Sequence, residues 1–289
     1  MKNCRVIGRL LMVVVIFVFG ATAAEAPNIT FTFKNIVISG ATNTFVNGIN
    51  NSGVLVGSYV IGFTVSHGFT LKGSKLTILD DPKGKRTSCA GINGTGDVVG
   101  TYSTSTGASQ AFLHHGGKFT DIGPVGATSS GAGGINDKLE IIGSFVDAKG
   151  GTHGFLWNGK KYKQLDAPGA ISTVASGINN NGLVSVGWTD PSGHDNAAIY
   201  NGKKYTKINV PGAVRSIPGG IDLAGDVVYS WYDSANEYHG ALRLGGKYYK
   251  FDDPQGQGAT YGHGINDHQV VTGVYHDGNS IRGFQATYK

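Results

Sequence analysis

Glutamate, cysteine and charge are all scarce in this chain. Among 289 residues there are three Glu and two Cys, and only 15% are charged. Good helix formers are therefore few, and the 47 Gly would each cost a helix about 1 kcal/mol relative to Ala, so a helical bundle is excluded. A hydrophobic content of 40% is too high for a disordered chain, and glycines that do not recur at every third position exclude collagen. Abundant Val, Ile, Thr and Tyr instead predict an all-β protein of short strands.

Long hydrophobic runs are also missing, apart from one near the N-terminus. Lys2, Arg5 and Arg9 precede the apolar run Leu10–Phe19, and two Ala-x-Ala frames follow within residues 21–26. This order predicts a secretory signal peptide over residues 1–26. A retained anchor is the alternative, but ten apolar residues fall short of the ~20 that span a bilayer. We therefore expect a mature chain of residues 27–289 that is secreted, extracellular or periplasmic, and free of the membrane.

Loss of residues 1–26 leaves little charge and one thiol. It removes Lys2, Arg5, Arg9 and Glu25, which lowers the formal net charge from +5 to +3. A charge this small and dispersed argues against a nucleic-acid partner. Cys89 becomes the single cysteine, so no intramolecular disulfide can form, and we expect it to be a packed core residue.

An internal repeat organises the rest of the sequence. The tripeptide Gly-Ile-Asn, or once Gly-Ile-Asp, occurs six times at spacings of 43 or 44 residues, with its glycine at Gly48, Gly91, Gly134, Gly177, Gly220 and Gly264. Each unit divides into four short strands. In the fourth copy, for example, Asn201-Gly202 lies between two β-rich segments, a strong hairpin signal. Four strands in about 43 residues are typical of a β-propeller blade.

The two ends of the chain predict how the ring closes. The last unit lacks a fourth strand, whereas residues 29–38 form an extra strand that carries Phe33 one period before Leu76. We therefore expect one domain over residues 27–289, a six-bladed β-propeller of four-stranded blades of about 43 residues, in which the N-terminal strand joins the C-terminal blade. Two tandem β-trefoils are the alternative, but they require a break after the third copy, and the period continues there without one.

The repeat resembles a known family. Gly-Ile-Asn, Val-Val-Gly-x-Tyr at 98–102 and His-Gly-Phe-Leu-Trp at 153–157 are similar to the extracellular repeats of the HAF family, named for a His-Ala-Phe motif. The resemblance covers the whole mature chain, but the Phe is lost after Asn196 and His239, and the His is replaced by Arg282. It implies an exported bacterial repeat protein and supplies no catalytic residues.

Three further register positions recur with the repeat. An aromatic residue stands nine positions after the Asn or Asp: Tyr59, Tyr102, Phe145, Trp188, Trp231 and Tyr275. A hydroxyl residue stands four positions before the Gly: Thr44, Thr87, Ser130, Thr173, Ser216 and Thr260. A hydrogen-bonding residue forms the last set: His67, Gln110, His153, Asn196, His239 and Arg282. We interpret the aromatics as wedges packed between blades rather than a sugar-stacking ring, the hydroxyls as turn caps, and the last set as tethers within each blade rather than metal ligands.

Motifs for metals and nucleophiles are not found. Asp147, Asp190, Asp233 and Asp277 share one loop position, but the dense alternating ligands of a Ca²⁺ loop are missing, so we expect these carboxylates to close their own turns. His114-His115 and the pair His263 and His268 lack zinc-motif spacing or Cys partners. The sequence also has no nucleophile elbow and no phosphate-binding loop. We therefore predict no catalytic residue, no metal site and no cofactor; Ca²⁺ is conceivable but unsupported.

Candidate ligand-binding residues come from positions where the repeat is broken. The tight hairpins of each unit turn at one end of the strands, so the variable connections gather on the opposite face, where binding residues usually lie. The residues that depart from the repeat there are Lys83, Lys85, Arg86, His194, Arg215, Tyr238, Tyr261 and His263.

Two functions remain open at this stage. The even repetition favours an exported, non-enzymatic and monomeric binding or scaffold module for a glycan or a protein ligand. The alternative is a secreted carbohydrate-active propeller enzyme, a polysaccharide lyase or hydrolase, with Asp, His and Arg or Lys around the central opening. A carboxylate beside His or Arg at the channel mouth would favour the enzyme.

Overall fold

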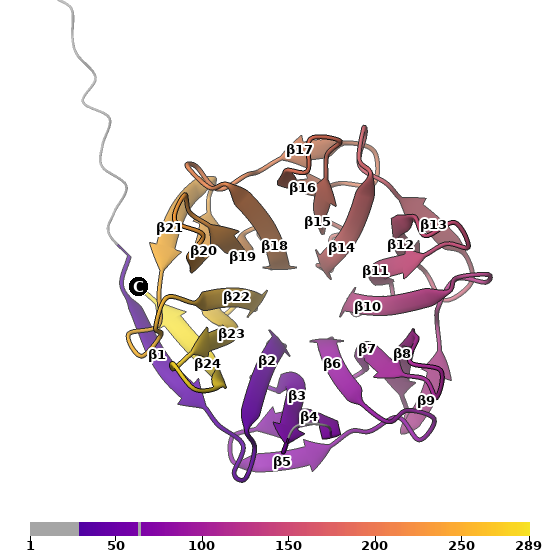
Figure 1. The fold of residues 1–289 in the computed structure, drawn as a ribbon, viewed down its shortest axis with the longest axis horizontal. Coiled ribbons are helices and arrows are strands. Elements are labelled where there is room, and N and C mark those ends of the chain that lie inside the picture. Colours follow the sequence, from indigo (N-terminus) through magenta and orange to yellow (C-terminus); the bar gives the residue numbers. More distant parts are fainter. Residues whose placement is uncertain (1–28, 63–64) are drawn as a thin grey trace, which may run out of the picture.

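The computed structural model describes residues 29–62 and 65–289, so the predicted signal peptide, including Cys4, lies outside the described residues. The described chain is all β, and none of its segments is a helix long and apolar enough to span a membrane. Its strands are arranged as a β-propeller, with the first strand of every repeat pointing toward the central axis (Figure 1).

Each repeat contributes four antiparallel strands. The first repeat consists of β2 (Asn43–Ile49), β3 (Leu55–Ile61), β4 (Val65–Lys72) and β5 (Lys75–Ile78). The second consists of β6 (Thr87–Ile92), β7 (Val98–Ser103), β8 (Ser109–His115) and β9 (Lys118–Asp121). The third consists of β10 (Ser129–Ile135), β11 (Ile141–Val146), β12 (Thr152–Trp157) and β13 (Tyr162–Leu165).

The other three repeats follow the same order. The fourth consists of β14 (Ser172–Ile178), β15 (Val184–Thr189), β16 (Asp195–Tyr200) and β17 (Tyr205–Lys207). The fifth consists of β18 (Arg215–Ile221), β19 (Val227–Tyr232), β20 (Tyr238–Leu244) and β21 (Lys247–Phe251). The sixth consists of β22 (Thr260–Ile265), β23 (Val270–His276) and β24 (Ile281–Tyr288), with β1 (Phe31–Ile36) as its outer strand.

The prediction of six separate blades does not hold in full. Within the described residues the strands form five hydrogen-bonded sheets, four of which have four strands, while the fifth has eight. The eight-stranded sheet contains the third and fourth repeats, which are joined where β12 and β14 run parallel at the single pair Thr152 and Ser172. A parallel bridge between Tyr238 and Ala259 occurs at the equivalent positions of the fifth and sixth repeats.

Closure by the N-terminal strand is confirmed. Strand β1 pairs antiparallel with β24 from Phe31 opposite Tyr288 to Ile36 opposite Gly283. Phe33 lies with its ring centroid 5.3 Å from that of Phe284, so the closing strand is also held by the core. This pairing covers an edge of the sixth repeat that would otherwise be open to other strands.

The close approach of the innermost strands at the central axis explains why the repeated tripeptide begins with glycine. In five repeats the innermost strand carries a register shift just before this glycine, and in the fifth the shift spans Gly219 and Gly220; successive glycines then face each other around the axis. A Cβ on Gly91 would lie 2.9 Å from the Cα of Gly134, and one on Gly264 would lie 2.9 Å from the Cα of Gly48. Only Gly permits the innermost strands to approach this closely.

Five of the six hydroxyl residues cap the preceding connection as predicted, whereas Ser130 accepts from Ala111 within β8, because Pro124 at the equivalent connection position has no N–H. All six are buried, and each accepts a hydrogen bond from a backbone N–H; Thr44 Oγ1, for example, accepts from Ile38 at 3.1 Å and Thr173 Oγ1 from Ala167 at 3.1 Å. Cys89 is fully buried, and burial raises the pKa of its thiol to about 12, as expected for a packed residue.

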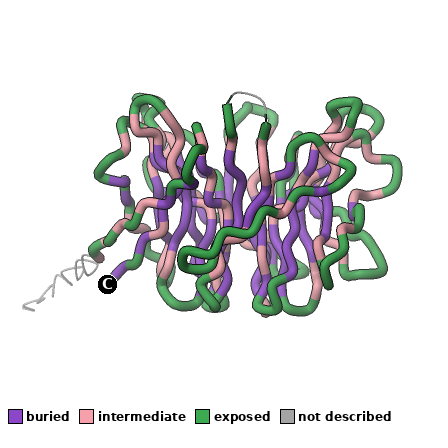
Figure 2. The backbone as a smooth tube through the Cα atoms, turned by 90° about the horizontal axis from the view of Figure 1, so that it is seen from below, coloured by how far each residue is buried: buried purple, intermediate pink, exposed green. Residues whose placement is uncertain are grey.

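The loops divide the molecule into two unlike faces. The turns between the first and second strands and between the third and fourth strands of each repeat form the hairpin face. The connections between the second and third strands and between repeats form the opposite loop face, as predicted. Exposed residues gather at both edges in Figure 2, while the strands between them are mostly buried. A site can therefore vary on the loop face without disturbing the core.

Candidate functional site

A pocket opens on the loop face between the fourth and fifth repeats. Its volume is about 220 Å³, and its walls come from β14, β15 and β16 on one side and β18 on the other. Its lining is mostly apolar, with Val174, Trp188, Ile217 and Pro218 among a few polar side chains. We call it the inter-repeat pocket.

One wall of the pocket lacks a side chain. Gly187 stands at a register position that carries Ser58, Thr101, Ser144 and Ser230 in other repeats. A Cβ at Gly187 would meet Pro218 Cδ at 3.3 Å, so any larger side chain would project into this space. Val174 and Ile217 on the two walls remain 41% and 40% exposed, so apolar surface faces solvent here.

Polar groups stand at the rim of this apolar surface. Thr189 Oγ1 donates a hydrogen bond of 2.9 Å to Asp195 Oδ1. Asp195 Oδ2 lies 3.7 Å from Arg215 Nε, an ion pair across the boundary between the fourth and fifth repeats. The pocket thus contains an indole and a carboxylate, and the guanidinium of Arg215 lies next to that carboxylate, outside the pocket lining.

The wedge interpretation holds for four of the six aromatics. Tyr59, Tyr102, Trp231 and Tyr275 are at most 4% exposed. Trp231 also donates from Nε1 to the carbonyl of Gly240 at 3.2 Å, and its ring stacks on His239. Phe145 and Trp188 are instead only partly buried, and each lines a pocket on the loop face. Packing between blades therefore does not account for the part of the Trp188 ring that is exposed in the pocket.

A second feature adjoins Arg215. Its guanidinium lies 5.6 Å from the ring centroid of Tyr232, whose ring is 3.7 Å from that of Tyr238, which in turn is 4.4 Å from that of Tyr261. We call Tyr232, Tyr238 and Tyr261 the tyrosine patch. All three are partly exposed, and burial raises the pKa of Tyr261 to about 12, with a further contribution from Tyr238. The patch crosses from the fifth repeat to the sixth.

The structure brings together three of the eight predicted ligand-binding residues. Arg215, Tyr238 and Tyr261 lie in the continuous surface just described. His194 is on the same face, exposed in the loop before β16, with Nδ1 3.6 Å from Asp190 Oδ1. It does not line the inter-repeat pocket.

The other predicted residues lie elsewhere. Lys83, Lys85 and Arg86 belong to the linker between the first and second repeats, where Lys83 Nζ donates to Asp121 Oδ2 at 2.7 Å. The prediction that His263 lies on the variable-loop face is wrong. It lines the central channel, and its Nδ1 lies 3.2 Å from the carbonyl of Val46, because the register shift of β22 turns this residue toward the axis.

The tether interpretation is confirmed where the residue is His. His67, His153 and His239 each place Nδ1 within 2.7 to 2.9 Å of an Asp thirteen positions later, and Asn196 pairs similarly with Asn209. The loop aspartates also behave as predicted. Asp147, for example, accepts backbone N–H bonds from Lys149 and Gly151, and the Gly151 bond is the main reason that its pKa is lowered.

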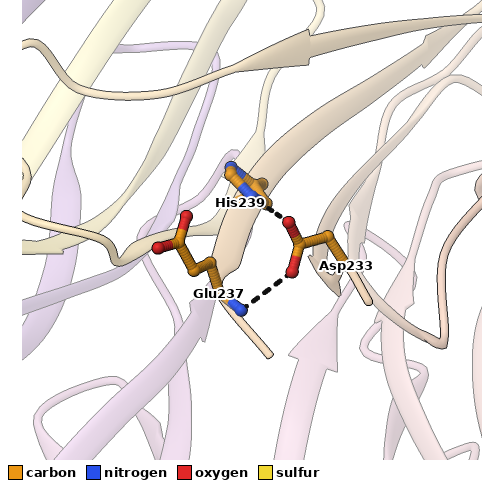
Figure 3. A group of neighbouring side chains, drawn as sticks. All are labelled: Asp233, Glu237 and His239. Carbon is orange, nitrogen blue, oxygen red and sulfur yellow. Dashed lines mark hydrogen bonds and ion pairs between the residues drawn. The ribbon is translucent and has the colours of Figure 1, made fainter. Parts of the chain in front are cut away.

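One group of described side chains has the composition of a metal site. Asp233 and Glu237 on the loop before β20 and His239 in β20 place a ligand atom each within 4.8 Å of one another (Figure 3). Asp233 Oδ1 already accepts from the backbone of Ala235 and Glu237, and His239 Nδ1 donates to Asp252. These contacts close the loop by themselves, and the expectation that the protein has no metal site stays a prediction.

The channel mouth on the hairpin face contains a ring of amides. The side chain of the tripeptide Asn donates to the backbone carbonyl of the next repeat at 2.7 to 3.3 Å, in Asn50, Asn93, Asn136, Asn179 and Asn266. The sixth position is Asp222, which has no amide to donate. Its pKa is raised to about 6, mainly by desolvation and further by Asp226 and Asp267.

Sequence reasoning missed four residues of the site. Trp188 was assigned a structural role, and Asp195, Gly187 and Tyr232 were not singled out. The available signal was their departure from the repeat: at the positions of Asp195 and Tyr232 most other copies carry Ser, Thr or Val, and Gly187 lacks the usual Ser or Thr.

Comparisons with known proteins identify the fold alone. No family model matches the chain, and no curated sequence matches it. Among solved structures, the SapL1 lectin in complex with alpha methyl fucoside has a TM-score of 0.55 at 10% identity, over 82% of this chain and 90% of that one. A triple Arg-to-Ala mutant of AofleA from Arthrobotrys oligospora has a TM-score of 0.55 at 11% identity, over 88% and 86%. Trypanosoma rangeli sialidase has a TM-score of 0.54 at 9% identity, over 90% and 59%.

Proposed function

We propose that this protein is a carbohydrate-binding β-propeller that holds a sugar ring in the inter-repeat pocket. The observation that carries the proposal is the partly exposed ring of Trp188 beside Asp195, with Arg215 across the repeat boundary. In four other repeats the equivalent aromatic is buried and unavailable.

The chemistry of the pocket suits a sugar. The C–H face of a pyranose packs on an aromatic ring, while its hydroxyls need donors and acceptors at the edge. Asp195 accepts and Arg215 donates, so adjacent hydroxyls can bind both groups. A volume of about 220 Å³ is smaller than the about 300–1,000 Å³ of pockets for drug-sized ligands, which favours a single sugar ring.

Binding is better supported than catalysis. The enzyme alternative needs a carboxylate beside His or Arg at the channel mouth. The described residues that line this mouth include Asp137, Asp222 and Asp267 but no His, Lys or Arg. The likeness to a lectin in complex with alpha methyl fucoside makes that glycoside the first probe, and the likeness to a sialidase is of the fold alone.

Other properties are part of the same proposal. We propose that the eight-stranded sheet acts as two blades, so that the ring has six quasi-equivalent blades of HAF-like repeats. The signal-like residues 1–26 support export to the extracellular space or periplasm, where glycans are accessible. Within residues 27–289 the single thiol, that of Cys89, is buried, and the net charge is low. Both properties are compatible with a secreted monomer.

The test is glycan binding by purified residues 27–289. We expect binding to at least one glycan on an array that includes alpha methyl fucoside, and Trp188→Ala should weaken that binding at least tenfold. Trp157→Ala is the matched control, because Trp157 is also partly exposed but ends β12 at the hairpin face. Gly187→Ser, which narrows the pocket with the side chain of other repeats, should also weaken binding.

Two results would count against the proposal. Absence of binding to every glycan by a folded protein would refute carbohydrate recognition. Binding that survives Trp188→Ala and Gly187→Ser unchanged would place the site elsewhere.

A further inference from the structure

The tyrosine patch is concentrated at one boundary of the ring. No other repeat has Tyr at any of the three register positions of Tyr232, Tyr238 and Tyr261. The other copies carry, for example, Thr189, Asp195 and Ile217 at these positions. Independent drift at exposed positions would scatter such changes over the ring, whereas here Tyr232 and Tyr261 both contact Tyr238.

The patch is also continuous with the inter-repeat pocket. Arg215 lies between them: Nε is 3.7 Å from Asp195 Oδ2 on the pocket side, and Cζ is 5.6 Å from the Tyr232 ring centroid on the other. The surface therefore leads from Trp188 in the fourth repeat to Tyr261 in the sixth. All of these residues lie on the loop face, where the first and third strands of a repeat begin and the second strand ends.

The chemistry of the two parts is similar. Partly exposed tyrosine rings offer apolar faces for sugar C–H groups and hydroxyls that exchange hydrogen bonds, as the indole and carboxylate do in the pocket. The ring centroids in the patch are only 3.7 and 4.4 Å apart, too close for separate platforms. The patch is thus one subsite beside the pocket.

We propose that the ligand is an oligosaccharide chain, with one sugar in the inter-repeat pocket and the following sugars laid over Arg215 onto the tyrosine patch. This inference rests on the proposed carbohydrate function and specifies its ligand class, a chain of at least three units rather than a terminal monosaccharide. Arg215 spans the two subsites and binds hydroxyls of the sugar between them.

Isothermal titration with chains of defined length tests the inference. The probes are fuco-, xylo-, cello-, manno-, chito- and galacturono-oligosaccharides of one to six units. In the series that binds, affinity should rise at least tenfold between one and four units and then level off. Tyr261→Ile and Tyr232→Thr, which introduce the residues of neighbouring repeats, should reduce this rise to less than threefold.

Matched variants separate the outcomes. Tyr162→Ala, at a tyrosine 40% exposed on outer strand β13, should leave the dependence on chain length unchanged, and Trp188→Ala should weaken binding of every length. Affinity that is independent of length, or a rise that survives both tyrosine variants, would overturn the extended site while leaving the pocket proposal intact. Failure of every series to bind would refute the proposed function itself.

Discussion

Asp222 interrupts the ring of amides, and repairing this break should stabilise the protein. In Asp222→Asn the new side chain can accept from Asp226 N–H, as the carboxylate now does at 2.8 Å, and can donate to the backbone carbonyl of Asn266. Asn50 makes the same two kinds of contact, from Val54 N–H and to the carbonyl of Asn93. The substitution thus repeats a solution that the chain uses five times.

The magnitude has two sources. A net hydrogen bond contributes about 0.5–1.5 kcal/mol. The raised pKa of Asp222, about 6, means that the charged carboxylate is disfavoured in the folded state relative to an ordinary value of about 3.9. Because Asp222 is partly solvent-accessible, we reduce the corresponding free energy to roughly 1 kcal/mol for solvent screening. At pH 7 the variant should gain about 1.5–2.5 kcal/mol, or a Tm rise of about 3–10 °C.

The gain should depend on pH with a definite sign. A folded-state pKa above the unfolded value stabilises the protein below about pH 4, and this contribution is lost as the pH rises through about 6. A protonated Asp222 can also donate a hydrogen bond, so the advantage of Asn should shrink to under about 0.5 kcal/mol at pH 4.

Urea unfolding of both proteins between pH 4 and pH 8 measures this difference. Asn179→Asp is the converse control, since it creates a second break and should destabilise the protein at pH 7. A stability gap that is zero at pH 7, or equal at pH 4 and pH 7, would refute the reasoning about the ring.

Two further predictions concern packing. Trp231→Ala should cost about 3–5 kcal/mol in the free energy of unfolding because it empties a buried site. Trp188→Ala should cost less than about 1.5 kcal/mol because the Trp188 ring is partly exposed. Calorimetry compares the two variants, and equal costs would contradict the difference in burial. Gly91→Ala should cost about 1–3 kcal/mol in the free energy of unfolding, since its Cβ would lie 2.9 Å from the Cα of Gly134. Urea unfolding measures this cost, and a Gly91→Ala variant as stable as the unsubstituted protein would exclude crowding at the axis.

Most of the architecture could be predicted because the residues that determine it recur at fixed positions of the repeat. A glycine that has no room for a Cβ and a buried hydroxyl recur once per unit, and a His that pairs with an Asp recurs in three of the six units, so the period reveals them. The pairing of β1 with β24 was predictable for the same reason, since Phe33 keeps the register of the outer strands.

The remaining features depend on departures from the repeat, whose consequences are three-dimensional. The bridge between Thr152 and Ser172, like that between Tyr238 and Ala259, depends on how closely the edges of neighbouring repeats approach. The lining of the inter-repeat pocket depends on the contact of Gly187 with Pro218, two residues far apart in sequence. Arg215, Tyr238 and Tyr261 were found as departures, but their contact through Tyr232 was visible only in the fold, and the register shift that moves His263 into the channel was not visible in the sequence.

The most direct test of the central claim is a crystal structure of residues 27–289 with the tightest-binding glycan. The account predicts a sugar ring packed on Trp188, with hydroxyls within hydrogen-bond distance of Asp195 and Arg215. A glycan bound at any other place in the ring, with the inter-repeat pocket empty, would contradict it.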